Sequence, residues 1–274
     1  MRVQCREAGT FTSVNNLPQL GTGQKFAIAL SLAAIGGFVD AVGYIALFQI
    51  FTANMSGNSV HIGMYLGQFD LSGLTRPACA ISAFVAGMVL TRIAIEIATR
   101  IGVRRIASFT LSAEVVLLLL FAQATPRMHL GQIVDLQSPV YFALVAMLAF
   151  AMGVQTVTLT HVGPLTVYTT FVTGTLTKFA ESFTEAIFWI YDRVRQSRAL
   201  SEVARLAAKQ QDVQHAALLA AAWVCYLAGA ALGTLAKYRW ELRAMYFPVA
   251  VLVLLVLVDR FRPIAAGEDP HQHA

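Results

Sequence analysis

The residues best suited to chemistry in this sequence lie in one short polar stretch. Residues 51–60 read FTANMSGNSV and are rich in small polar or flexible residues, of which Asn54, Ser56, Gly57 and Asn58 are the candidate ligands. An acidic residue, Asp40, precedes them in an apolar run. If that run lies in a membrane, a carboxylate there costs on the order of 3 kcal/mol even on permissive scales, so Asp40 needs a compensating role. It can bind a cation or carry a proton, or it can hold the backbone of residues 54–58 by hydrogen bonds. The sequence leaves both roles open.

A weaker copy of this stretch occurs in the second half of the chain. Residues 168–177 read YTTFVTGTLT, and aligning Gly57 with Gly174 places Thr52 over Thr169. This correspondence predicts a duplicated unit whose second copy supplies neutral ligands. The candidate residues of that copy are Thr170, Thr173, Gly174 and Thr175, together with Gln155, which takes the place of Asp40.

Two further ionisable residues, Glu114 and Arg92, fall inside apolar runs. We predict that they form a buried ion pair, with a proton relay through Glu114 as the alternative. Arg92 can also pair with Glu96, which lies one helical turn further on. No cluster of His, Cys, Asp or Glu has metal-ligand spacing, and no serine or cysteine has an evident base. We therefore expect no metal, no cofactor and no enzymatic activity.

Composition defines the surroundings of these residues. Of 274 residues, 57% are hydrophobic and 13% charged, and the mean hydropathy is +0.63. Soluble chains carry roughly a quarter charged residues, and a transmembrane helix needs about 20 largely apolar residues, which several runs here provide. The runs are continuously apolar rather than alternating, so helices are favoured over a barrel. We predict an all-helical, polytopic membrane protein in contact with the lipid bilayer. The basic residues behind the net charge of +5 are then interpreted as markers of cytoplasmic loops, so we expect no nucleic-acid partner.

The apolar runs come in a repeating order. Residues 26–69 contain one charge, Asp40, and residues 136–177 contain none, so each stretch is too long for a single span. Each can hold two spans, or one span and a broken or re-entrant segment that carries the polar stretch. Four plainer spans complete the set, at residues 77–97, 106–124, 215–236 and 242–258. The order is one long stretch and two spans, repeated once.

The number of crossings decides how the two halves are related. Three crossings in each half make the halves inverted, and four make them parallel. Six crossings with the N-terminus inside place most lysines and arginines on the cytoplasmic side, which favours an inverted 3+3 arrangement over eight crossings. In either arrangement one basic group falls on the outer side: Lys237, Arg239 and Arg243.

These assignments divide the chain into five parts. Residues 1–25 form a cytoplasmic N-terminal tail, and residues 26–125 form the first membrane repeat. Residues 126–138 form an extracytoplasmic loop. Residues 139–262 form the second repeat, with a charged cytoplasmic segment at 192–214, and residues 263–274 form a C-terminal tail.

Gly57 and Gly174 are suited to breaks in membrane helices, where small polar side chains satisfy the freed backbone groups. Transporters place substrates between two such breaks related by a repeat. We therefore predict a transporter of a small solute or ion with its site between the broken segments. One alternative is a scaffold or assembly protein that forms a homo-oligomer, in which the Gly-xxx-Gly pairs 63/67 and 229/233 allow helices to pack closely. A membrane enzyme is a less favoured alternative.

Two paired signatures resemble one family. GGFVDA at residues 36–41 followed by TANMSGNSV at 52–60, and MGVQT at 152–156 followed by TTFVTGTLT at 169–177, are similar to the YoaK-like family of bacterial multi-pass membrane proteins. Met55 and Ser56 depart from that family's pattern, in which we expect Gln or Val and Thr. The resemblance covers roughly residues 25–262. It implies a bacterial inner-membrane location and about six helices, and it supplies no activity.

Overall fold

The computed structural model describes residues 22–103, 105–124, 135–158, 161–162, 165–166, 172–195, 200–208 and 210–261. These residues form helices joined by short turns, apart from one antiparallel pair of two-residue strands, β1 (His161–Val162) and β2 (Leu165–Thr166). The prediction of an all-helical membrane protein is confirmed. The helices are α1 (Thr22–Ala46), α2 (Met55–Gly67), α3 (Leu71–Arg100), α4 (Ile106–Ala124), α5 (Pro139–Thr158), α6 (Val172–Arg195), α7 (Leu200–Ala207), α8 (Gln211–Trp240), the 3-10 helix η2 (Glu241–Met245) and α9 (Tyr246–Phe261).

Five stretches of the described chain are long and apolar enough to cross a membrane. Four of them lie within α1, α3, α4 and α5, and the fifth, Gln211–Phe261, contains α8, η2 and α9. The shorter α2 and the amphipathic α6 are not among them. α1, α3, α4 and α5 correspond to predicted spans, and α2 corresponds to the segment predicted after the first span. α6 instead begins near the end of the second long stretch, residues 136–177, and continues to Arg195.

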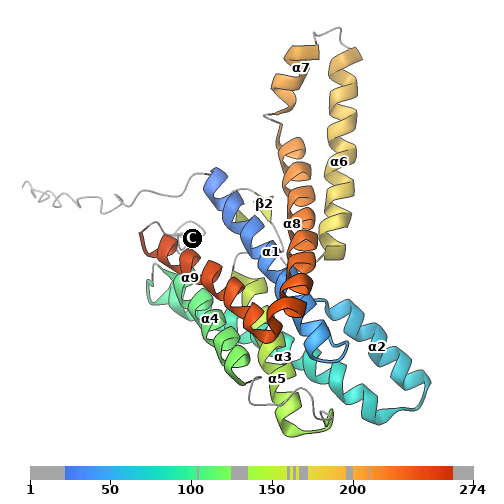
Figure 1. Ribbon diagram of the computed structural model, residues 1–274. Coiled ribbons are helices and arrows are strands. Elements are labelled where there is room, and N and C mark those ends of the chain that lie inside the picture. The colour runs from blue at the N-terminus through green and yellow to red at the C-terminus, as the bar shows by residue number, and fades with distance from the viewer. Residues whose placement is uncertain are drawn as a thin grey trace, which may run out of the picture.

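The helices pack in two crossed pairs (Figure 1). α1 lies along α8, and α5 lies along α3, and these two pairs make the most extensive helix contacts. α2 packs on α3, α6 packs on α8, and α4 contacts both α5 and α9. α6, α7 and the first half of α8 project from the rest of the molecule as a helical arm.

Glycines bring the backbones of the crossed pairs into contact. A Cβ at Gly37 of α1 would collide with the carbonyl oxygen of Tyr226 in α8, and a Cβ at Gly153 of α5 would collide with that of Phe84 in α3. Gly229 similarly faces the backbone of Ala34. Small residues allow such close approach between membrane helices. The pair Gly229/Gly233 thus packs against α1 of the same chain.

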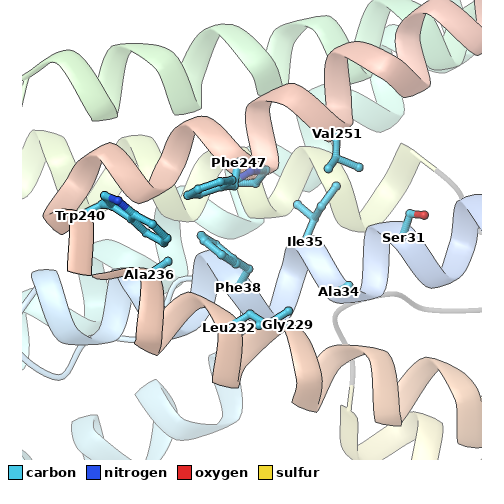
Figure 2. A pocket seen from close by; sticks show the side chains of 11 residues that line it. Ser31, Ala34, Ile35, Phe38, Gly229, Leu232, Ala236, Trp240, Phe247 and Val251 are labelled. Atoms are coloured by element: carbon cyan, nitrogen blue, oxygen red, sulfur yellow. The ribbon is translucent and has the colours of Figure 1, made fainter. Parts of the chain in front are cut away.

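A groove opens between α1, α8 and α9 (Figure 2). Its volume is about 460 Å³, and apolar side chains form most of its lining. Phe38 of α1, Trp240 of α8 and Phe247 of α9 stand close together at one end.

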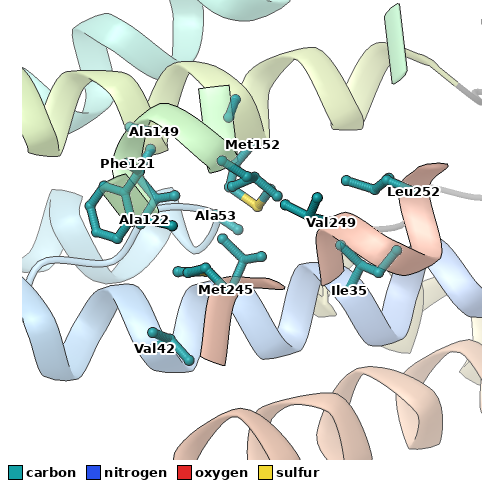
Figure 3. Close-up of a cluster of buried hydrophobic side chains, with 14 of the residues drawn as sticks. Ile35, Val42, Ala53, Phe121, Ala122, Ala149, Met152, Met245, Val249 and Leu252 are labelled. Carbon is teal, nitrogen blue, oxygen red and sulfur yellow. The ribbon is translucent and has the colours of Figure 1, made fainter. Parts of the chain in front are cut away.

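The core lies where α1, α4, α5 and α9 converge (Figure 3). Phe121, Met152 and Leu252 are fully buried there, and Ala53, from the segment between α1 and α2, reaches into the same cluster. Between α1 and α2, Ile50, Thr52 and Ala53 are therefore part of the protein interior, although Phe48 and Gln49 are exposed.

Candidate functional site

The chain breaks its helical path between α1 and α2, and we call residues 47–54 the first break. α1 ends with a hydrogen bond from the Gln49 amide to the carbonyl of Tyr44, at 2.9 Å. Phe48 and Gln49 have φ values of 51° and 68°, a region that residues with side chains rarely adopt. This backbone conformation is held only because the surroundings determine it.

Asp40 holds the backbone a few residues further on, at Thr52 and Ala53. Its Oδ1 accepts hydrogen bonds from the backbone N–H of Thr52 at 2.7 Å, from that of Ala53 at 2.8 Å and from the Thr52 hydroxyl at 3.2 Å. Its Oδ2 accepts a hydrogen bond from the hydroxyl of Tyr226 in α8, at 2.8 Å. Asp40 is 3% exposed and Thr52 is fully buried. We call Asp40, Thr52, Ala53 and Tyr226 the Asp40 network; it joins α1, the first break and α8.

This arrangement decides how Asp40 acts in this conformation. Both carboxylate oxygens are engaged with donors of the protein, which offsets the cost of burying the group. Asp40 therefore holds the backbone, as one of the two roles expected from the sequence requires. The hydrogen bonds fall on Thr52 and Ala53, just before the predicted residues 54–58, because the chain turns back toward α1 before α2 begins.

Asn58 closes the first break from the side of α2. Its Oδ1 accepts a hydrogen bond from the Phe51 amide at 3.1 Å, and its Nδ2 donates to the Phe51 carbonyl at 2.7 Å. The side chain thus pairs with Phe51 as a neighbouring backbone would. Ser56 donates to Asn54 Oδ1 at 2.7 Å, and Asn54 makes no side-chain cap to α2.

Gly57 lies in the first turn of α2 and leaves room for an aromatic ring. A Cβ on Gly57 would stand 2.7 Å from two ring carbons of Phe51. The Phe51 ring lies between Tyr44, at a centroid distance of 4.4 Å, and His61, at 6.3 Å. The helical path is broken before Gly57 rather than at it, so the predicted position of the break was wrong by a few residues.

The second copy shares this position. α6 begins at Val172, two residues before Gly174, as α2 begins at Met55, two residues before Gly57. Thr175 is buried, Gly174 is half-buried and Thr173 belongs to the first turn of α6. Thr170 lies outside the described residues.

Gln155 contacts α1 but not the Asp40 network. Its Nε2 donates to the carbonyl of Leu32 at 2.7 Å, and its Oε1 is buried without a hydrogen-bond partner among the described residues. Leu32 precedes Asp40 by about two helical turns. The structure therefore separates Gln155 from the residues with which the sequence grouped it.

Glu114 is fully buried in α4, and neither of its carboxylate oxygens has a hydrogen-bond partner among the described residues. The predicted pair with Arg92 was wrong, because Arg92 is exposed on α3. Glu96 forms its ion pair with Arg100, at 3.0 Å, and not with Arg92.

Sequence reasoning missed Tyr226, the partner that links Asp40 to the second half. Its signal was a phenol within the small-residue stretch CYLAGA of an apolar run, where a hydroxyl needs a partner. It also missed Asp259, which is buried at the end of α9 and accepts hydrogen bonds from the backbone N–H of Ser108, at 2.8 Å, and from its hydroxyl. Asp259 thus satisfies the first turn of α4.

The chemistry of the site follows from these contacts. Within the described part of the chain, no three His, Cys, Asp or Glu side chains gather as a metal site would need. What the site provides is a buried, fully hydrogen-bonded acid that holds an interrupted helix. The first turn of α2 starts beside it without a side-chain cap.

Comparisons with known proteins place these features in a family. The model of the family described as "Protein of unknown function (DUF1275)" matches residues 28–258, a range that contains Asp40, both copies of the polar stretch and Tyr226. The UPF0700 transmembrane protein YoaK of Bacillus subtilis (strain 168) is 25% identical over 163 residues, covering 58% of this chain and 67% of its own. No solved structure matches. The chain therefore belongs to the DUF1275 family of membrane proteins.

Proposed function

We propose that the protein transports a small solute or ion across the bacterial inner membrane, using the first break and the start of α6 as the binding region. The observation that carries this proposal is the Asp40 network. Irregular backbone at membrane depth is tolerated where it is buried in protein or lines a cavity, and transporters use such interrupted helices to bind substrates. The hydrogen bonds that offset the cost of burying Asp40 also hold the first break in place.

Two identically spaced crossings support an internal duplication. Gly153 lies 116 residues after Gly37, and Phe150 lies 116 residues after Ala34. Their partners are also equally spaced, because Tyr226 lies 142 residues after Phe84 and Gly229 lies 142 residues after Gly87. The contacts Gly37–Tyr226 and Gly229–Ala34 are thus repeated as Gly153–Phe84 and Gly87–Phe150. α1 and α5 are corresponding helices in this scheme, as are α3 and α8.

In the proposed duplication, the two helix crossings differ in the residues that occupy corresponding positions. The shift of 116 residues carries Asp40 to Thr156 and not to Gln155, the position expected from the sequence, and Phe84 corresponds to Tyr226. Only the crossing of α1 with α8 therefore has the acid and the phenol, and the crossing of α5 with α3 has neither. With three membrane spans in each half, the repeats are inverted and the N-terminus is cytoplasmic. Because only one of the two crossings carries an acid, the proposed site is acidic on the side of Asp40.

The start of α2 offers the substrate its contacts. A helix N-terminus carries unsatisfied N–H groups and a partial positive charge. Asn54 leaves this turn without a side-chain cap, and Ser56 is exposed beside it. These groups suit an anionic or hydrogen-bond-accepting part of a solute, while Asp40 acts as a positioning residue behind them.

The test is a ligand screen by thermal shift on the purified full-length protein at several pH values, followed by uptake of any hit into proteoliposomes. A ligand at 100 times its Kd stabilises the native state by about 2.7 kcal/mol. We expect Ser56→Ala to weaken the shift and Asp40→Asn to reduce uptake, while Asp135→Asn in an exposed turn leaves both unchanged. A substrate whose uptake is the same in wild type, Ser56→Ala and Asp40→Asn would remove the first break from the transport site.

One observation favours the alternative of an oligomeric scaffold. A Cβ added at Gly63 or Gly67 of α2 would have no other atom within 4 Å, so this small-residue pair is open to a partner helix. If the protein is a scaffold, Gly63→Leu combined with Gly67→Leu changes the oligomeric state in light scattering. Under the transport proposal the same double variant retains uptake.

A further inference from the structure

The apolar groove between α1, α8 and α9 ends beside a group of basic residues that the proposed transport site does not use. Lys237 and Arg239 belong to the last turn of α8, and Arg243 belongs to η2. We call these three residues the basic cluster. Lys237 follows Ala236 and Arg239 precedes Trp240, and both Ala236 and Trp240 line the groove.

We propose that this groove and the basic cluster together bind an anionic phospholipid, with one acyl chain in the groove and the phosphate at the cluster. The groove is large enough for a ligand, because its volume of about 460 Å³ lies within the range of about 300–1,000 Å³ typical of small-molecule sites. Its occupant must be apolar, since the lining is almost entirely hydrocarbon and aromatic (Figure 2).

The groove is open toward the membrane. Leu232, Phe247 and Val251 line it and are 60%, 51% and 38% exposed. They lie within Gln211–Phe261, a stretch long and apolar enough to span a bilayer, so the surroundings of the groove are lipid. A lipid chain can therefore enter from the side without leaving the hydrocarbon phase.

Aromatic residues mark the end of the groove as the level of the lipid headgroups. The ring of Trp240 lies 5.3 Å from that of Phe247, and Tyr238, on the same turn, is 77% exposed. Trp and Tyr concentrate at the boundary between hydrocarbon and water. The basic cluster lies at this end, where the phosphate of a lipid stands when its chain lies along α8.

Charge selects an anionic headgroup over a zwitterionic one. Each Lys or Arg near an anionic lipid surface adds favourable attraction. Within the described residues the basic cluster makes no ion pair with an acid. The site does not depend on the proposed transport activity.

Native mass spectrometry of the detergent-purified full-length protein tests the headgroup preference. Phosphatidylglycerol and phosphatidylcholine with the same acyl chains are titrated separately. We expect phosphatidylglycerol to bind about tenfold more tightly or better, which corresponds to the attraction of a few basic side chains. Equal affinity for the two lipids would overturn the proposal.

Two pairs of matched variants test the parts of the site. Lys237→Gln, Arg239→Gln and Arg243→Gln together should remove the preference, while the same substitution of Arg195, Arg205 and Arg260, which lie elsewhere, should keep it. Loss in both variants would attribute the preference to net charge and sink the assignment.

Leu232→Trp should fill the groove and lower the affinity for both lipids by about tenfold. Leu235 is 65% exposed on the same helix but outside the groove, so Leu235→Trp should leave both affinities unchanged. Both side chains point outward, so both variants should retain the wild-type Tm. Unchanged lipid binding in Leu232→Trp contradicts an acyl chain in the groove. Glycerol 3-phosphate, which has no acyl chain, should fail to displace the lipid. If it does displace the lipid, the site recognises the phosphate alone and the proposed acyl-chain groove is wrong.

Discussion

At the scale of single residues, the protein treats its two intramembrane acids in opposite ways. Asp40 has a hydrogen-bond donor for each of its oxygens, whereas Glu114 has none among the described residues. Burial of a polar group is costly only when its hydrogen bonds are lost. Asp40 therefore contributes to the structure through its hydrogen bonds, and Glu114 remains in the core at a net cost.

The hydroxyl of Tyr226 is the only tie from α8 to the Asp40 carboxylate among the described contacts, and its removal should be measurable. Tyr226→Phe leaves Oδ2 of Asp40 buried with one donor fewer, which should cost about 1–3 kcal/mol in the free energy of unfolding. Tyr238→Phe, on the exposed side of the same helix, should change it by less than about 0.5 kcal/mol. Denaturant titration in detergent compares the two variants. Equal stabilities would show that the phenol does not bond to Asp40.

Glu114 allows a test with the opposite sign. Glu114→Leu replaces a group without partners by hydrocarbon in an apolar helix interface, so the free energy of unfolding should rise by about 1–3 kcal/mol. Glu181→Leu on the exposed face of α6 is the control and should give no such gain. If Glu114→Leu lowers the stability instead, the acid has a partner in the native membrane state, such as a bound ion or water.

At the scale of elements, the sequence predicts helices well where hydropathy changes sharply and less well where it fades. The ends of α4 at Ile106 and Ala124 agree with the predicted run, because charges and polar residues adjoin them. α3 begins at Leu71, before the predicted residue 77, because the Asp70 side chain caps it and adds a turn that is less apolar. Tyr226 lies 186 residues from Asp40, so no local pattern could pair them.

The glycine contacts between helices predict opposite effects for one substitution. Gly153→Ala places a methyl group against the backbone of α3, and overpacking of this kind costs about 1–3 kcal/mol. Gly63→Ala meets nothing within 4 Å and should stabilise α2 by up to about 1 kcal/mol, because alanine favours helices. Unfolding measurements on both variants check the sign. A neutral Gly153→Ala would mean that α3 and α5 are further apart than described.

The cap of α3 predicts a dependence on pH. Hydrogen bonds from the Ser72 hydroxyl and the Gly73 amide hold the pKa of the exposed Asp70 carboxyl below its ordinary value of 3.8. A lowered pKa in the folded state stabilises it fully above the ordinary value, and this contribution is lost as pH falls through the lower pKa. The Tm of the wild type should therefore approach that of Asp70→Ala below pH 3.8 and exceed it at neutral pH. A constant difference between the two Tm values at all pH would show that the charged cap contributes nothing.

At the scale of the whole molecule, the decisive question is whether the two halves are inverted. α2 and α6 begin at corresponding positions. α2 packs on the next helix, α3, and α6 packs on the long helix α8, which follows the short α7. If three spans make up each half, the turn after α2 and the end of α6 lie on opposite sides of the membrane. If the halves are parallel, both lie on the same side.

Cysteine labelling distinguishes these arrangements. Gln68→Cys lies in the exposed turn between α2 and α3, and Arg195→Cys lies at the exposed end of α6, each in a chain whose Cys5, Cys79 and Cys225 are replaced by alanine. In intact cells a membrane-impermeant maleimide should label the Gln68→Cys variant and spare the Arg195→Cys variant, because most basic residues, including those near Arg195, then lie in the cytoplasm. Permeabilised cells should label both and serve as the control. Labelling of both variants in intact cells, or of neither, would make the halves parallel, and the starts of α2 and α6 could then no longer face the binding region from opposite sides of the membrane.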